Sequence, residues 1–184
     1  MTKNEWNNCC DAPDMIEFVW RQEPFRTVSE RFKEYPAAND WKDYLDIEMP
    51  LYKFYIACCR EIWPLLPQNE SKRGVELAEQ YIRGETEWEK LSRYNWYVEG
   101  AAFTFDYETD TEKVSLWVEE TESSHMELIE KLGSSNTLDL LKDAAYFVDY
   151  AMIYPSIQPK GSPSACYHKF LQPKLLRQFV KYPV

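Results

Sequence analysis

Glycine is scarce in this chain, and this scarcity limits how many tight turns the fold can contain. Only 5 glycines occur among 184 residues, against an average usage of about 7%. A sandwich or barrel of short strands needs a turn about every 8 to 12 residues, whereas long helices need few connections. The chain is therefore expected to form one mostly α-helical domain over residues 1–184, an irregular bundle of about seven to nine helices.

Helix-start signals recur along the sequence and support a helical fold. In a capping box, a threonine and a glutamate three residues later each accept a hydrogen bond from the other residue's backbone amide. Three such pairs occur: Thr2 with Glu5, Thr27 with Glu30, and Thr86 with Glu89. Asp11 ahead of Pro13 indicates a fourth start, and Thr137 is expected to open a late helix.

The most apolar helical pattern covers Met49–Trp63, where charge is confined to three positions. A broad apolar face at the helical period predicts a central, mostly buried helix. The next helix is expected to begin near Asn69 and to end at Gly84, because glycine can adopt the left-handed cap conformation. Pro173 is expected to kink or divide the last segment, 164–180, because proline lacks an amide donor.

Residues 103–118 allow two interpretations. Apolar and polar residues alternate there, with apolar residues at Phe103, Phe105, Tyr107, Val114, Leu116 and Val118. A short β-hairpin near 103–118 that turns at Asp110 would explain the alternation. Runs this short also fit a helix, and we favour helix with the hairpin as the alternative.

Charge is distributed unevenly along the chain, whose net charge is −10. Residues 99–130 contain one basic and ten acidic residues, whereas residues 150–184 contain five basic and no acidic residues. The acidic stretch fits a solvated face, a surface onto which the basic C-terminal segment folds, or a surface that meets a basic partner such as a nuclease toxin or a DNA-binding protein. Net negative charge disfavours nucleic acid as the partner.

The five cysteines indicate in which cellular compartment the protein is expected to lie. They comprise two adjacent pairs, Cys9–Cys10 and Cys58–Cys59, and the single Cys166. An odd number of thiols, with no apolar leader before them, predicts a reduced protein of the cytoplasm, and no apolar run is long enough for a membrane span. Adjacent cysteines do not form the Cys-x2-Cys hook of a zinc site, so each pair is expected to give one buried and one peripheral thiol.

Glu119, Glu122 and His125 are the best metal-ligand candidates. The Glu-x-x-His spacing places a carboxylate and an imidazole on one helix face, as in di-metal helical bundles. Such a site needs a second pair, and the other histidine, His168, has Ala165 three residues before it. His125 also lies on the apolar stripe of its helix, which favours a hydrogen-bonded histidine at the edge of the core.

Trp96 and Tyr97 stand out because adjacent residues on a helix cannot both face the same core. Helical spacing instead assigns Leu91, Val98 and Ala102 to the inner face. One of the two aromatic residues is therefore expected to be exposed for a partner, since such side chains are enriched at binding hot spots.

Several segments resemble a family of bacterial helical proteins of unknown function. These segments are 2–9, 13–18, 54–63, 74–81 and 172–183. The most specific is the helix that carries Cys58-Cys59-Arg60-Glu61-Ile62-Trp63. The resemblance implies a mostly helical module of the bacterial cytoplasm and transfers no activity, catalytic residue or cofactor to this chain.

Two functions are compatible with these features. The first is a non-catalytic, acidic protein-interaction module, a class that includes inhibitors and immunity-type proteins, and it follows from the acidic stretch. It needs no cofactor, nucleic acid or membrane, and its partner is expected to be a protein, with a basic one favoured. The alternative is a metal-dependent enzyme that uses Glu119, Glu122 and His125 on one helix.

Overall fold

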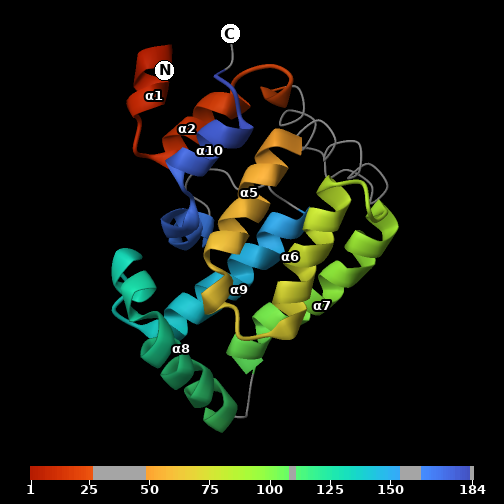
Figure 1. The fold of residues 1–184 in the computed structure, drawn as a ribbon, viewed down its shortest axis with the longest axis vertical. Helices are drawn as coiled ribbons and strands as arrows, with labels where there is room; N and C mark the ends of the chain where they lie inside the picture. The colour runs from red at the N-terminus through yellow and green to blue at the C-terminus, as the bar shows by residue number, and fades with distance from the viewer. Residues whose placement is uncertain (27–48, 108–110, 154–162, 183–184) are drawn as a thin grey trace.

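Every element in the computed structural model is helical over the residues it describes, 1–26, 49–107, 111–153 and 163–182. The elements are α1 (Lys3–Asn8), α2 (Ala12–Trp20), α5 (Met49–Glu61), η1 (Trp63–Leu65), α6 (Asn69–Ile82), α7 (Trp88–Tyr107), α8 (Thr111–Lys131), α9 (Thr137–Ile153), η2 (Pro163–Phe170) and α10 (Pro173–Phe179), where η denotes a 3-10 helix (Figure 1). The mostly α-helical fold is therefore confirmed. The hairpin does not form in the described part of 103–118, because α7 continues to Tyr107 and α8 begins at Thr111.

Local side-chain chemistry starts the first two helices. The Thr2 hydroxyl accepts a hydrogen bond from the Glu5 amide at 3.2 Å, and the Glu5 carboxylate accepts one from the Thr2 amide at 2.6 Å. The Asp11 carboxylate accepts a hydrogen bond from the Asp14 amide at 2.9 Å. Both starts are as predicted, since these side chains satisfy amides that have no partner within the helix. The start expected at Thr27 lies outside the described residues.

One other helix start differs by two residues from its predicted position, and one agrees with it. The helix expected from Thr86 begins at Trp88. α9 begins at Thr137, as predicted, and the preceding Asn136 caps it, because the Asn136 side-chain oxygen accepts a hydrogen bond from the Leu138 amide at 3.0 Å. Asparagine is among the strongest N-cap residues.

Glycine and proline end helices where the sequence predicts. Gly84 has a φ of 72°, and the following Glu85 amide donates to the Gln80 carbonyl at 2.8 Å, which closes the end of α6. This left-handed conformation is open to glycine at little cost. Pro173 opens α10 and separates it from η2, so the C-terminal segment forms two short helices.

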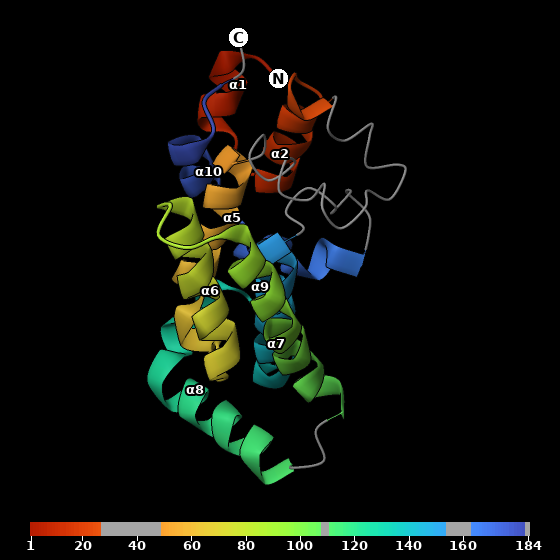
Figure 2. The same ribbon diagram turned by 90° about the vertical axis from the view of Figure 1, so that its right-hand side faces the viewer.

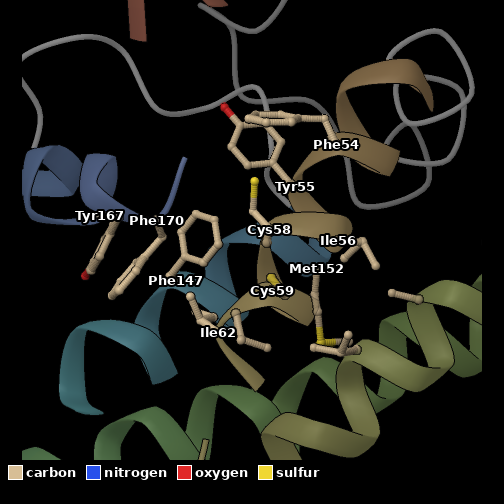
Figure 3. Packing of buried hydrophobic residues seen from close by; sticks show 14 of the residues in the cluster. Phe54, Tyr55, Ile56, Cys58, Cys59, Ile62, Phe147, Met152, Tyr167 and Phe170 are labelled. Carbon is tan, nitrogen blue, oxygen red and sulfur yellow. The ribbon is translucent and has the colours of Figure 1, made fainter. Parts of the chain in front are cut away.

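The core is built mainly around α5 and α9. Seven of the thirteen residues of α5 are buried, as expected for a central helix. α9 contacts α5, α6, α7 and α8, so it is equally central, which its sequence pattern did not indicate. Figure 3 shows Phe147 of α9 beside Phe170 of η2, with their ring centroids 5.4 Å apart.

The two ends of the molecule carry different elements. The chain termini lie together with α1, α2 and α10 at one end, and α8 lies at the other end (Figures 1 and 2). The Tyr182 hydroxyl donates to the Met1 carbonyl at 3.0 Å, which ties the termini to each other. Within the described ranges, no helix combines the length and apolar character needed to cross a bilayer.

Gly74 marks the closest approach among three helices. It lies on α6, and a Cβ atom added there would be 2.5 Å from both Met152 Sδ of α9 and Val98 Cγ2 of α7. Contacts this short force neighbouring atoms to move. Glycine is therefore required by packing at this position, since its backbone lies within a helix of otherwise ordinary conformation.

We expect the substitution Gly74→Ala to lower the free energy of unfolding by about 1 to 3 kcal/mol, because Val98 is β-branched and cannot easily rotate away. Urea denaturation measures the change. Gly100→Ala is the matched control, since Gly100 is exposed on α7 with open space where its Cβ would lie. The control should raise stability by about 0.5 to 1 kcal/mol through helix propensity, and equal destabilisation by both variants would contradict the packing argument.

Candidate functional site

The predicted metal ligands lie on α8, but the helix does not keep all three on one regular helical face. His125 has φ −136° and ψ 28°, so α8 is kinked at the residue that should complete the Glu-x-x-His face. Glu119 and Glu122 are exposed, and the Glu122 carboxylate accepts a hydrogen bond from the Thr137 hydroxyl at 2.6 Å. His125 is half-buried, as expected at a core edge, but none of the described residues makes the expected hydrogen bond to its ring.

Across the described ranges, no three His, Cys, Asp or Glu side chains are grouped closely enough to hold a metal ion. The metal hypothesis therefore has no preformed ligand set on α8, because the kink at His125 disrupts the spacing on which it depends.

Elemental analysis of the purified protein provides the test for a metal. From the geometry we expect His125→Ala to leave the metal content, and the effect of a chelator on Tm, unchanged. Stoichiometric metal that is lost in the His125→Ala variant would restore the metal-dependent enzyme as the better hypothesis.

The adjacent cysteines of α5 are both buried (Figure 3), which corrects the expectation of one buried and one peripheral thiol in this pair. Helices pack against more than one side of α5. The two cysteine side chains, which point in different directions from the helix, therefore both enter the core. Burial raises the pKa of Cys58 to about 12 and raises that of Cys59 well above its ordinary value. Both thiols are thus held protonated, a state that is unreactive as a nucleophile or metal ligand. In the other pair, Cys10 is exposed, as expected for one thiol, whereas Cys9 is half-buried rather than buried.

α7 carries a row of exposed aromatic side chains, which we call the aromatic stripe. It consists of Trp96, Phe103 and Tyr107, which are 76%, 41% and 78% exposed. Their spacing of seven and four residues places them on one face of a helix. The inner face of α7, with Leu91, Val98 and Ala102, is buried as predicted. Trp96 and Tyr97 are both exposed, which goes beyond the expectation that one of them would be.

Contacts with α9 position the C-terminal part of the aromatic stripe, around Phe103. The Phe103 ring lies between Tyr107 and Tyr146, at centroid distances of 6.2 Å and 6.0 Å with edge-to-face geometry. Asp106 accepts hydrogen bonds from the Tyr146 hydroxyl and from Lys142. Burial and the Asp106 carboxylate raise the pKa of Tyr146, so its hydroxyl stays a proton donor. The Phe103 ring is consequently held in place, whereas Tyr107 stays largely exposed.

The exposed face of α8 is acidic. Its exposed glutamates are Glu112, Glu119, Glu120, Glu122, Glu127 and Glu130, and Leu116 and Met126 are exposed among them. None of these glutamates forms an ion pair with the described residues. We refer to these six glutamates as the acidic face.

The basic C-terminal residues that the structure describes do not cover the acidic face. Lys169 pairs with Asp143 of α9 at 2.7 Å, and Arg177 donates to the backbone carbonyls of Trp6 and Cys9. α10 lies with the termini, at the end of the molecule opposite α8 (Figure 2). The interpretation in which the basic segment folds onto residues 99–130 therefore does not hold for these residues.

Two carboxylates influence each other across the interface between α7 and α9. Asp149 of α9 is largely buried, and burial together with the charge of Glu99 of α7 raises its pKa to about 7. An acid whose pKa is raised in the folded state takes up protons on folding. Between about pH 4 and pH 7 the folded state then binds more protons than the unfolded state, so stability falls as the pH rises.

We expect Asp149→Asn to remove this pH dependence and to raise the free energy of unfolding at pH 8 by about 1 to 3 kcal/mol. Urea denaturation between pH 5 and pH 8 measures both effects. Glu130→Gln, on the exposed face of α8, serves as the control and should leave the slope unchanged. A slope that persists in Asp149→Asn would show that another group is responsible.

Comparison with known proteins gives no relative: no family model, curated protein or solved structure matches this chain. The resemblance to bacterial helical proteins thus stays a prediction, and the functional argument depends on the chain's own surface. Sequence reasoning missed Phe103 and Tyr107 as surface residues. The signal was present, since they follow Trp96 at helical spacing, but their alternation with polar residues also fitted a strand.

Proposed function

We propose that this chain is a non-catalytic protein-interaction module whose partner is a basic protein. The acidic face of α8 is the observation that carries the proposal. Six exposed glutamates lie on one helix with only Lys113 and Lys131 as basic residues. Like charges at neighbouring helical positions repel each other and destabilise the helix. A basic partner would relieve this repulsion on binding.

The position of the acidic face supports the same function. α8 lies at one end of the molecule, away from the termini (Figures 1 and 2), and its carboxylates are free of ion pairs with the described residues. A surface of one charge sign attracts an oppositely charged partner over distance and accelerates its association. Inhibitors and immunity-type proteins of basic enzymes bind in this way, and we place this chain in that functional class.

Pull-down from the native host with the purified chain tests the proposal. We expect a basic protein to be retained in low salt and released as the ionic strength rises. Glu120→Gln combined with Glu127→Gln should weaken retention about threefold or more, since each removes a partner's counter-charge.

A matched control changes the net charge equally at the opposite end of the molecule. Asn7→Lys with Gln178→Lys alters two exposed residues on α1 and α10 and should leave retention unchanged. Retention of no basic protein, or equal loss with both double variants, would show that the acidic face is not a binding surface.

A further inference from the structure

α1 is held to the rest of the molecule by a single buried side chain. Trp6 is 3% exposed, whereas the other five residues of this helix are exposed. Among the described elements, none packs extensively against α1. A helix needs about 12 to 15 residues to be even marginally stable alone. The six residues of α1 therefore stay helical only while Trp6 is docked.

The site that receives Trp6 is built by two segments that are distant in sequence. Between ring centroids, Trp6 lies 6.2 Å from Phe18 of α2 and 6.2 Å from Tyr182, which follows α10. The Phe18 and Tyr182 rings are themselves stacked, 5.8 Å apart at an interplanar angle of 17°. α1 therefore covers these two rings at the end of the molecule where α2 and α10 meet (Figures 1 and 2).

Hydrogen bonds from the C-terminal segment hold α1 at both of its ends. The Arg177 guanidinium donates to the Trp6 carbonyl at 3.0 Å and also to the Cys9 carbonyl. The Tyr182 hydroxyl donates to the Met1 carbonyl at 3.0 Å. Carbonyls in the last turn of a helix lack partners within it and attract a cation, so Arg177 closes the C-terminal end of α1.

The elements that receive α1 are anchored without it. α10 packs extensively against α5, and its Leu176 is fully buried. α2 buries four apolar side chains of its own, those of Ala12, Met15, Ile16 and Val19. Only residues 9–11 connect α1 to α2. Removal of α1 from its site would therefore leave both receiving helices in place.

We propose that α1 is a strap that detaches as a unit, hinged at residues 9–11, while the other helices stay folded. Detachment uncovers the stacked rings of Phe18 and Tyr182 at the end of the molecule opposite α8 (Figure 2). The open form thus presents an apolar surface that the closed form conceals. This inference is independent of the proposed function, because it involves neither α8 nor its glutamates.

Hydrogen exchange of the full chain, followed by mass spectrometry at increasing urea below the unfolding transition, tests the proposal. We expect the amides of α1 to exchange at a rate that hardly depends on urea, because a local opening exposes little surface. The amides of α5 should exchange only through global unfolding, at a rate that rises steeply with urea.

Variants of the contacts identify what holds the strap. Arg177→Gln removes a charged donor from two carbonyls and should speed exchange in α1 about tenfold without making it depend on urea. Lys174→Gln is the matched control, since it removes the same charge from an exposed position of α10 that makes no hydrogen bond to the described residues. It should change exchange in α1 by less than about twofold. Trp6→Ala should leave α1 unprotected while α5 keeps its protection.

A thiol provides a second measurement. Cys9 is half-buried at the hinge, and Arg177 binds its carbonyl, whereas both cysteines of α5 are buried. In a Cys10→Ser background, iodoacetamide should modify Cys9 at a rate that Arg177→Gln raises and Lys174→Gln leaves unchanged. The two thiols of α5 should stay protected until the chain unfolds.

Three results would overturn the inference. One is the same steep urea dependence in α1 and α5, since α1 would then open only together with the whole fold. Another is equal acceleration of α1 exchange by Arg177→Gln and Lys174→Gln. The third is loss of protection in α5 in the Trp6→Ala variant, which would make Trp6 a necessary part of the core instead of the anchor of a strap.

Discussion

The close packing of α6, α7 and α9 at Gly74 determines which surface this protein presents. A side chain at Gly74 would collide with Val98 and Met152, so the three helices approach each other only because glycine is there. This approach fixes the rotation of α7 about its own axis. Once Val98 and Ala102 face inward, helical geometry directs Trp96, Phe103 and Tyr107 to solvent.

The charged residues divide into those that hold the fold together and those that do not. Arg177 and Lys169 are used in internal contacts, with backbone carbonyls of the N-terminal segment and with Asp143. Apart from Glu122, which accepts a hydrogen bond from the Thr137 hydroxyl, the glutamates of α8 make no such contact with the described residues, and their mutual repulsion opposes folding. A cost of this kind on one exposed helix is consistent with a surface that functions in recognition rather than in stability.

Much of the secondary structure could be predicted because the responsible chemistry is local. Thr2, Asp11 and Gly84 act within one helical turn, and such signals do not depend on the rest of the fold. The burial of both Cys58 and Cys59 could not be predicted in this way, because it depends on helices packing against several sides of α5. No proline or glycine accompanies the kink at His125. The spacing of Glu122 and His125 therefore suggested that both side chains lie on one face of a straight helix.

Exposure of the aromatic stripe is the clearest case of a property that local sequence cannot decide. Phe103 and Phe105 are the same residue type, two positions apart, yet their environments differ. Phe105 packs against Trp117 of α8, with ring centroids 5.7 Å apart, whereas Phe103 contributes to the exposed stripe. The difference arises because Trp117 of α8 covers Phe105, whereas the rings beside Phe103, those of Tyr107 and Tyr146, leave it 41% exposed. An aromatic residue on α7 is therefore core or surface according to where the following helix lies, and that placement is a property of the whole fold.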